Sequence, residues 1–300
     1  YSADFILEKL QEWSDAEVDD RQELIAKAAA YSGYSHLLLG EGFCTVAIDE
    51  SPELTSQEVI QRAVDRFDVA LQAAQSAGSA DLANFARVGR ARAYLGLGNT
   101  SSALADAQQV PADFEYVATA SGEFSRRANR VYAQNGDGPT GGTALSIGEE
   151  YRNMTYNGDP DPRVPVSDFI RTEADGTDLY YQYKYTSLSD PLPLATGDEA
   201  QLIVAEIQGG QTAVNIINNF HSAVGLDPFP GGSAAEIEAQ VIEERQRELW
   251  LEGHRFFDIR RLDLPLIPAP NTPYRKGGLY GTDRCFPLPA VEIRNNPNIG

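Results

Sequence analysis

The sequence is poor in basic residues and histidine, and it has no long hydrophobic run. Its 300 residues carry 24 Lys and Arg against 44 Asp and Glu, a net charge of −20, with only 3 His. Such a surface repels phosphate backbones, so nucleic-acid binding is the first function excluded. No stretch approaches the roughly 18 apolar residues that a membrane-spanning helix needs. Any contact with a membrane must therefore have another origin.

Cysteine is scarce as well, with Cys44 and Cys285 far apart in the chain. They lack the close spacing of a zinc knuckle or a redox motif, so a disulfide and two buried thiols both stay open. The chain starts at Tyr1 without a basic segment or an apolar leader, and we expect a mature or trimmed form. The 26 Gly and 17 Pro predict turn-rich loops around a framework of regular secondary structure. This combination suits a secreted binding protein.

That framework is helical, because apolar residues recur at helical spacing. The long helix after residue 55 opens with a capping box, Thr55 to Glu58, and its predicted buried stripe is Val59, Ala63, Phe67, Ala70 and Ala74. The expected helices cover residues 3–13, 20–39, 56–74, 80–97, 101–110, 201–221 with a turn at Gly209-Gly210, and 234–263.

Two helical hairpins of one style lie about 110 residues apart and are similar to tetratricopeptide repeats, in which small residues let antiparallel helices pack closely. We therefore expect a mainly α protein forming a single domain over residues 1–300. Its helical scaffold covers residues 1–111 and 196–263, a loop-rich insertion covers 112–195, and a C-terminal loop segment covers 264–300.

The insertion differs in composition, being rich in Tyr, Gly, Asp, Asn and Pro, with short strands predicted at 128–133 and 178–186. Long loops in a compact protein usually carry function. Sugar recognition uses aromatic faces together with amide and carboxylate groups. Alternation of Tyr181, Tyr183 and Tyr185 also fits one face of a strand packed on the scaffold, which we favour for those three. The predicted ligand contacts are Tyr151, Tyr156, Tyr180, Tyr181, Asn153 and Asn157.

The segment 244–261, Glu-Arg-Gln-Arg-Glu-Leu-Trp-Leu-Glu-Gly-His-Arg-Phe-Phe-Asp-Ile-Arg-Arg, resembles the signature helix of the SusD/RagB family, a pattern of the type ERRRELAFEGHRWFDLRR. Three further blocks resemble that family in the expected order: 159–164, 184–206 and 286–298. The matching signature positions are Arg245, Arg247, Glu248, Trp250, Glu252, Gly253, His254, Arg255, Phe257, Asp258 and Arg260.

This resemblance implies a SusD-like scaffold in a cell-surface lipoprotein of the outer membrane, held there only by an N-terminal lipid anchor. It implies that the protein passes oligosaccharides or peptides to a TonB-dependent, SusC-like transporter, without cofactor and without enzymatic activity. The alternative is a structural or assembly protein that uses the helical-repeat scaffold for protein contacts, in an extracellular polymer for example.

The signature segment also invites a metal or active-site interpretation, since Glu248, Glu252, His254 and Asp258 recur at helical spacing. One His among five arginines is a poor metal set, so ion pairing is favoured, with Trp250 and Phe257 in the core and Gly253 allowing close helix approach. No nucleophile elbow, phosphate loop or zinc motif occurs, which disfavours a hydrolase. The calcium candidates 135–138 and Asp159 with Asp161 do not follow the EF-hand pattern, and ordinary turns are preferred.

Overall fold

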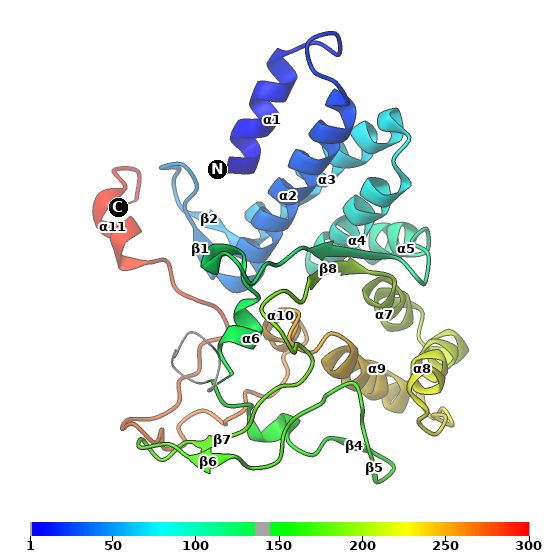
Figure 1. Cartoon of the computed structure of the whole chain (residues 1–300), viewed down its shortest axis with the longest axis vertical. Helices are drawn as coiled ribbons and strands as arrows, with labels where there is room; N and C mark the ends of the chain where they lie inside the picture. The colour runs from blue at the N-terminus through cyan, green and yellow to red at the C-terminus, as the bar shows by residue number, and fades with distance from the viewer. Residues whose placement is uncertain (1, 136–144, 300) are drawn as a thin grey trace.

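Figure 1 shows a mainly helical molecule, described over residues 2–135 and 145–299 in a computed structural model. The predicted fold class is confirmed, because helices dominate and the strands are short. The described helices are α1 (Ser2–Glu12), α2 (Arg21–Gly42), α3 (Ser56–Ala77), α4 (Ala80–Gly96), α5 (Thr100–Ala107), α6 (Arg130–Ala133), α7 (Gly197–Gln208), α8 (Gly210–Val224), α9 (Ala234–Glu248), α10 (Arg255–Arg261) and α11 (Ala290–Asn295), with 3-10 helices η1 (Ser125–Arg127) and η2 (Glu149–Tyr151).

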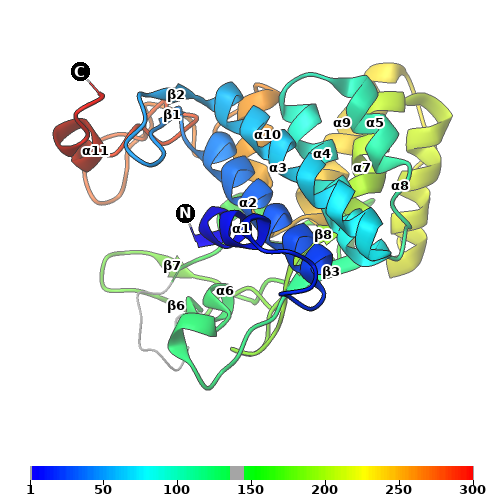
Figure 2. The ribbon, with the colours of Figure 1, turned by 90° about the horizontal axis from the view of Figure 1, so that it is seen from above.

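The helices α2 to α5 stack side by side, and α7, α8 and α9 lie beyond α5 (Figures 1 and 2). Local sequence signals set several of their ends. The expected capping box is present, since the Thr55 side chain accepts from the Glu58 amide and the Glu58 carboxylate accepts from the Thr55 amide. Ser233 and Glu236 form the same arrangement at the start of α9. Apart from the helix predicted over 234–263, the helix ends predicted from pattern fall within a few residues of the observed ones.

Two buried apolar clusters hold the scaffold together. The larger one joins α1 to α5 with part of α7, and the smaller one lies between α7, α8 and α9. All five residues of the stripe predicted on α3 are buried. Phe67, the largest of them, faces Gly33 and Gly89, where an added Cβ would lie 2.7 Å and 2.3 Å from the Phe67 ring. Glycine at both positions is thus what lets α2 and α4 close around this ring.

The strands pair in twos, as antiparallel ladders. Strands β3 and β8 join the two ends of the insertion, with Glu115 opposite Thr196 and a register shift after Tyr116. The loop-rich segment between them is therefore attached to the scaffold at its base. The strands are β1 (Thr45–Val46), β2 (Leu54–Thr55), β3 (Glu115–Ala118), β4 (Thr155–Tyr156), β5 (Asp159–Pro160), β6 (Arg171–Thr172), β7 (Asp178–Leu179) and β8 (Leu192–Thr196).

Two strands predicted in the insertion need correction. The strand expected at 128–133 is wrong, because the Asn129 side chain caps the short helix α6 by accepting from the Tyr132 amide at 3.0 Å. The strand expected at 178–186 is reduced to β7. Beyond it the backbone pairs irregularly with the preceding loop, for example from the Tyr183 amide to the Pro165 carbonyl at 2.8 Å.

The single helix expected over 234–263 is also wrong. The chain leaves α9 after Glu248 and becomes helical again only in α10. Between them, Leu251 (φ 61°) and Gly253 (φ 85°) adopt left-handed backbone conformations that interrupt the helical hydrogen bonds. A Cβ on Gly253 would meet nothing within 4 Å, so its role is the positive φ and not close helix approach. Glu248 and Glu252 consequently do not share one helical face.

The C-terminal segment, expected to be loop throughout, contains the short helix α11. A disulfide joins Cys44, just after α2, to Cys285, with 5.1 Å between the two Cα atoms. Next to it, the Cys44 amide donates to the Phe286 carbonyl at 2.9 Å and the Phe286 amide donates to the Gly42 carbonyl at 2.8 Å. The end of the chain is thereby fixed against the scaffold.

Candidate functional site

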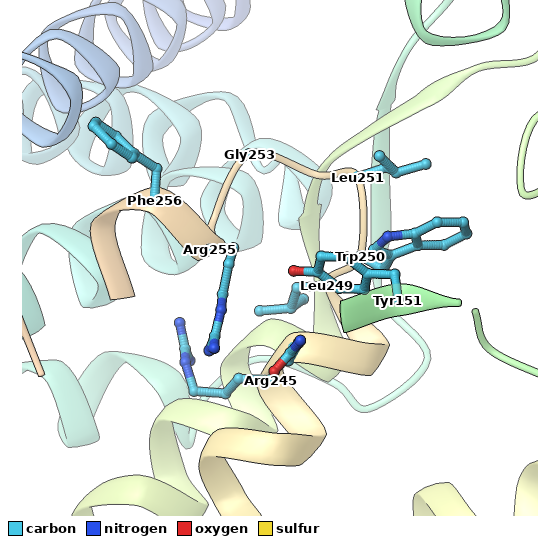
Figure 3. A pocket seen from close by; sticks show the side chains of 9 residues that line it. Tyr151, Arg245, Leu249, Trp250, Leu251, Gly253, Arg255 and Phe256 are labelled. Atoms are coloured by element: carbon cyan, nitrogen blue, oxygen red, sulfur yellow. The ribbon is translucent and has the colours of Figure 1, made fainter. Parts of the chain in front are cut away.

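A pocket of ≈ 300 Å³ opens where η2 of the insertion meets the turn between α9 and α10 (Figure 3). The pocket is lined by Tyr151, by residues of α9, by the turn that breaks the expected long helix and by the start of α10. The volume is at the lower end of the range for ligand pockets, so the pocket has room for one or two ring-sized groups of a ligand. The helix break is therefore what creates the concave surface.

Tyr151 and Trp250 form the aromatic side of this pocket, with ring centroids 6.1 Å apart and planes tilted by 33°. Trp250 is buried, and Lys184 fixes its backbone by donating to the Trp250 carbonyl at 2.8 Å. Burial raises the pKa of the Tyr151 hydroxyl, which Arg255 and Gln246 oppose. The phenol is therefore neutral at pH 7 and can both donate and accept a hydrogen bond.

Two arginines form the polar side. Arg245 donates through Nε and Nη2 to the Asp258 carboxylate at 3.0 and 3.1 Å, and its buried Nη1 has no hydrogen-bond partner among the described residues. The Nη1 of Arg255 is buried without a partner as well. In Figure 3 both guanidinium groups point into the same part of the pocket, and the Tyr151 hydroxyl points toward the side of Arg255. Aromatic faces and unused donors thus meet in one place.

Buried ion pairs attach the insertion to α9 beside this pocket. Arg163 donates to Asp161 at 2.7 Å, to Glu244 at 2.5 Å and to Glu248 at 2.7 Å. Arg247 of α9 donates to Asp161 at 3.0 Å. Burial alone would raise the pKa of Asp161, but the hydrogen bonds from Arg163 and Arg247 outweigh it and lower that pKa to about 2. This carboxylate therefore stays charged at neutral pH.

Glu252 and Asp258 of the signature segment are also ion-paired, whereas Arg260 donates to backbone carbonyls. Glu252 accepts from Lys184 at 2.6 Å. Asp258 accepts from Arg245 and Arg261, and Arg260 donates to the Phe43 carbonyl at 3.1 Å. These contacts agree with the interpretation of the segment as an ion-pairing one. Phe257, as expected, is buried in the larger apolar cluster.

His254 lies in a second buried cluster, with Arg92, Glu41 and Glu199. Arg92 donates to Glu41 at 2.7 Å through Nε, and its Nη1 lies 3.3 Å from His254 Nε2. Burial lowers the pKa of His254 well below its ordinary value, and the nearby Arg92 adds to that effect, so the imidazole is neutral. Burial also raises the pKa of Glu199 to about 7. This cluster joins α2, α4 and α7 to the start of α10, away from solvent.

The structure separates the predicted ligand contacts. Tyr151 lines the pocket, but Tyr156 packs edge-on against His221 with ring centroids 4.3 Å apart. Tyr180 lies under the Arg152 guanidinium, 4.0 Å from ring centroid to Cζ, and Tyr181 is buried. Asn153 and Asn157 are exposed at turns with φ of 57° and 50°. Of the six, Tyr151 alone lines this pocket, and all six stay predictions as ligand contacts.

The three alternating tyrosines do not all pack against the scaffold as predicted. Tyr181 and Tyr185 are buried, whereas Tyr183 is 51% exposed, because the segment does not form the expected regular strand.

No described group of three or more His, Cys, Asp or Glu residues is arranged to hold a metal ion. Asp161 gives its oxygens to Arg163 and Arg247, and Asp159 lies exposed in β5. Gly136, Asp137 and Gly138 of the other calcium candidate lie outside the described residues. Over residues 2–135 and 145–299, no helix is long and apolar enough to cross a bilayer.

Comparison with solved structures gives matches over almost the whole chain. A SusD superfamily protein from Parabacteroides distasonis matches with a TM-score of 0.72 at 16% identity, over 99% of this chain and 82% of that one. A SusD-like carbohydrate binding protein from Bacteroides vulgatus matches with a TM-score of 0.71 at 15% identity, over 99% and 80%. Surface glycan-binding protein A from Bacteroides uniformis matches with a TM-score of 0.68 at 14% identity, over 99% and 81%. At these identities, the matches establish the fold.

Residues 199–299 match the model of the SusD family, and they contain α7 to α11 with the signature segment. This match covers about a third of the chain, and the fold of the rest is similar to that of SusD-like structures. No curated protein sequence matches the chain. The resemblance drawn from the signature segment is thereby confirmed, and the SusD-like fold extends beyond the matched third to the insertion and the N-terminal helices.

The spacing argument missed several pocket residues, and Trp250 and Arg255 are the most informative of them. Trp250 had been assigned to the core and Arg255 to ion pairing, because both were placed on a continuous helix. Trp250 is indeed buried, but it also lines the pocket, as does Arg255. The available signal was Gly253, since a glycine inside a helical pattern weakens that assignment. Its positive φ is what turns the chain and exposes the pocket.

Proposed function

We propose that this protein captures oligosaccharides at the cell surface and delivers them to a TonB-dependent, SusC-like outer-membrane transporter, without catalysing a reaction. The observation that carries the proposal is the pocket between Tyr151 and Trp250 on a SusD-like fold. Aromatic rings pair with the apolar face of a pyranose, while the Tyr151 hydroxyl, the Gln246 amide and guanidinium donors serve its hydroxyl groups. Two of the similar structures are those of a SusD-like carbohydrate binding protein and a surface glycan-binding protein, which supports this class of ligand.

Localisation and partner belong to the same proposal. A lipid anchor upstream of the described residues would hold the protein on the outer membrane, since family resemblance points to that arrangement. Co-purification with a large outer-membrane barrel from the native host tests the partner. Repeated recovery of the protein without any such barrel would contradict the delivery step while leaving ligand capture to its own test.

Ligand capture is tested by measuring binding of neutral and acidic oligosaccharides, with peptides included as the second ligand class. We expect Tyr151→Ala to weaken glycan binding about tenfold, because it removes one ring of the aromatic pair. Isothermal titration calorimetry or affinity electrophoresis measures the change.

The matched control is Tyr183→Ala, which removes an exposed tyrosine of the insertion that does not line the pocket. It should leave affinity unchanged. Equal losses in both variants, or no glycan binding by the wild-type protein, would refute the proposed site.

A further inference from the structure

The charge of the pocket is opposite to that of the protein. The chain carries a net charge of −20, yet the residues lining the pocket include two arginines and no carboxylate. Because the protein as a whole repels anions, a local excess of positive charge in a concave site is a specific feature and not a consequence of composition.

Arg245 is held rigidly in this pocket. It is 5% exposed, and its Nε and Nη2 atoms bind the Asp258 carboxylate, which also accepts from Arg261. One donor, Nη1, remains unpaired although it is buried. Buried donors on charged groups are normally satisfied, so an exception that faces a cavity indicates a missing acceptor.

Arg255 supplies the second donor. Over the described part of the chain it forms no ion pair, although seven acidic groups are paired with the other arginines near α9 and α10, namely Glu206, Glu199, Glu243, Glu244, Glu248, Asp161 and Asp258. Its buried Nη1 is also without a partner. These seven acidic groups are therefore already used by other arginines, and the Arg255 guanidinium is left to bind an acidic group of a ligand.

We propose that this pocket recognises a carboxylate carried on a sugar ring, so that the captured glycan contains a uronic acid. A carboxylate between the unpaired Nη1 atoms of Arg245 and Arg255 satisfies both donors through charge-assisted hydrogen bonds. The sugar ring then stacks against Tyr151 on the adjoining side, where the buried Trp250 ring packs behind it. The volume of ≈ 300 Å³ admits one such residue with its neighbour extending out of the mouth.

This inference rests on the proposed glycan-capturing function and narrows it. A peptide C-terminus presents the same carboxylate without a pyranose ring. The aromatic pair favours the sugar, and the peptide becomes an outcome of the test.

The test compares ligands that differ only in the carboxylate. Binding of glucuronate- or galacturonate-containing oligosaccharides is measured against their glucose and galactose counterparts. We expect the wild-type protein to prefer the uronate forms and Arg255→Gln to lose about ten- to a hundredfold in affinity for them, with little change for the neutral forms. Arg255→Lys, which keeps the charge but not the paired donors, should retain part of the preference.

Arg62→Gln is the matched control, because it removes an exposed positive charge of α3 that does not line the pocket. An unchanged melting temperature of Arg255→Gln shows that the loss is not unfolding. Equal affinity for uronate and neutral forms, or an unaltered preference in Arg255→Gln, overturns the carboxylate proposal while leaving glycan capture in place. Preference for a peptide with a free C-terminus over its amide, without uronate binding, also overturns it. No binding to any glycan overturns the proposed function itself.

Discussion

The helical scaffold and the loop-rich insertion are stabilised by different forces. The scaffold is built around two clusters of buried apolar side chains. The described part of the insertion contributes only Phe114 and Ala195 to the buried members of those clusters, and both lie at its base near β3 and β8. Further out, the insertion is joined to α9 by Arg163 and Lys184, each of which reaches acidic residues of the signature segment.

The stability of the scaffold and the shape of the pocket therefore depend on different interactions. Apolar burial does not depend on the protonation of side chains, and it holds the helices whatever the insertion does. Charged contacts depend on protonation and on both partners being present, so the position of Tyr151 relative to Trp250 depends on a few named side chains. The comparison predicts distinct effects of changing one region or the other.

The largest effect is expected from the scaffold. Phe67→Ala removes a fully buried ring that fills the space between Gly33 and Gly89, and it should lower the free energy of unfolding by about 3–5 kcal/mol. Urea denaturation followed by circular dichroism measures this loss. The control Phe124→Ala, at a ring that is 59% exposed, should change stability by less than about 0.5 kcal/mol. Similar losses in both would contradict the assignment of the core.

The next largest effect is expected at the attachment of the insertion. Arg163→Met leaves Asp161 and Glu244 buried without their shared partner, which should cost about 3 kcal/mol. Unlike the change at Phe67, the damage should be local, with faster amide exchange within residues 145–190 while α2 to α4 stay protected. Uniform loss of protection across the molecule would show that the two regions unfold as one unit.

The smallest effect concerns pH, and its sign differs between the regions. Burial raises the pKa of Glu199 from 4.5 to about 7, so its contribution to stability is present below about pH 4.5 and lost as pH rises through 7. The pKa of Asp161 is lowered from 3.8 to about 2, so its contribution is present above about pH 4 and lost as pH falls toward 2.

Glu199→Gln should therefore reduce the loss of stability between pH 5 and pH 8 by about 2 kcal/mol, measured from denaturation midpoints. Asp161→Asn should reduce only the loss below pH 4. If both variants retained the wild-type pH profile, these two carboxyls would not control it.

Much of the scaffold could be predicted because its signals are local. The box at Thr55 and Glu58, the apolar stripe of α3 and the Gly209-Gly210 turn each specify structure within a few residues. The break after α9 could not be predicted with confidence from periodicity, because Trp250 and Phe257 fit a helical stripe equally well. Only a glycine at the position now seen with φ of 85° argued against continuity.

The site was less predictable, since it joins residues that are distant in sequence. Tyr151 was selected because the insertion around it is rich in Tyr, Gly, Asp, Asn and Pro. Its partner Trp250 lies 99 positions later in the chain, and the two rings meet only after the insertion folds back on α9. Likewise, the unpaired state of Arg255 depends on which carboxylates the other arginines have taken, a property of the whole network.

The bond between Cys44 and Cys285 turns most of the polypeptide into a closed ring, because the two residues are 241 positions apart. The whole insertion and the pocket lie within that ring. A protease that cuts one exposed loop of the insertion thus opens the ring without releasing a fragment, because the disulfide keeps the two pieces covalently joined. Outside the cell, where loops meet proteases and thiols remain oxidised, such a molecule survives a single cut in one piece.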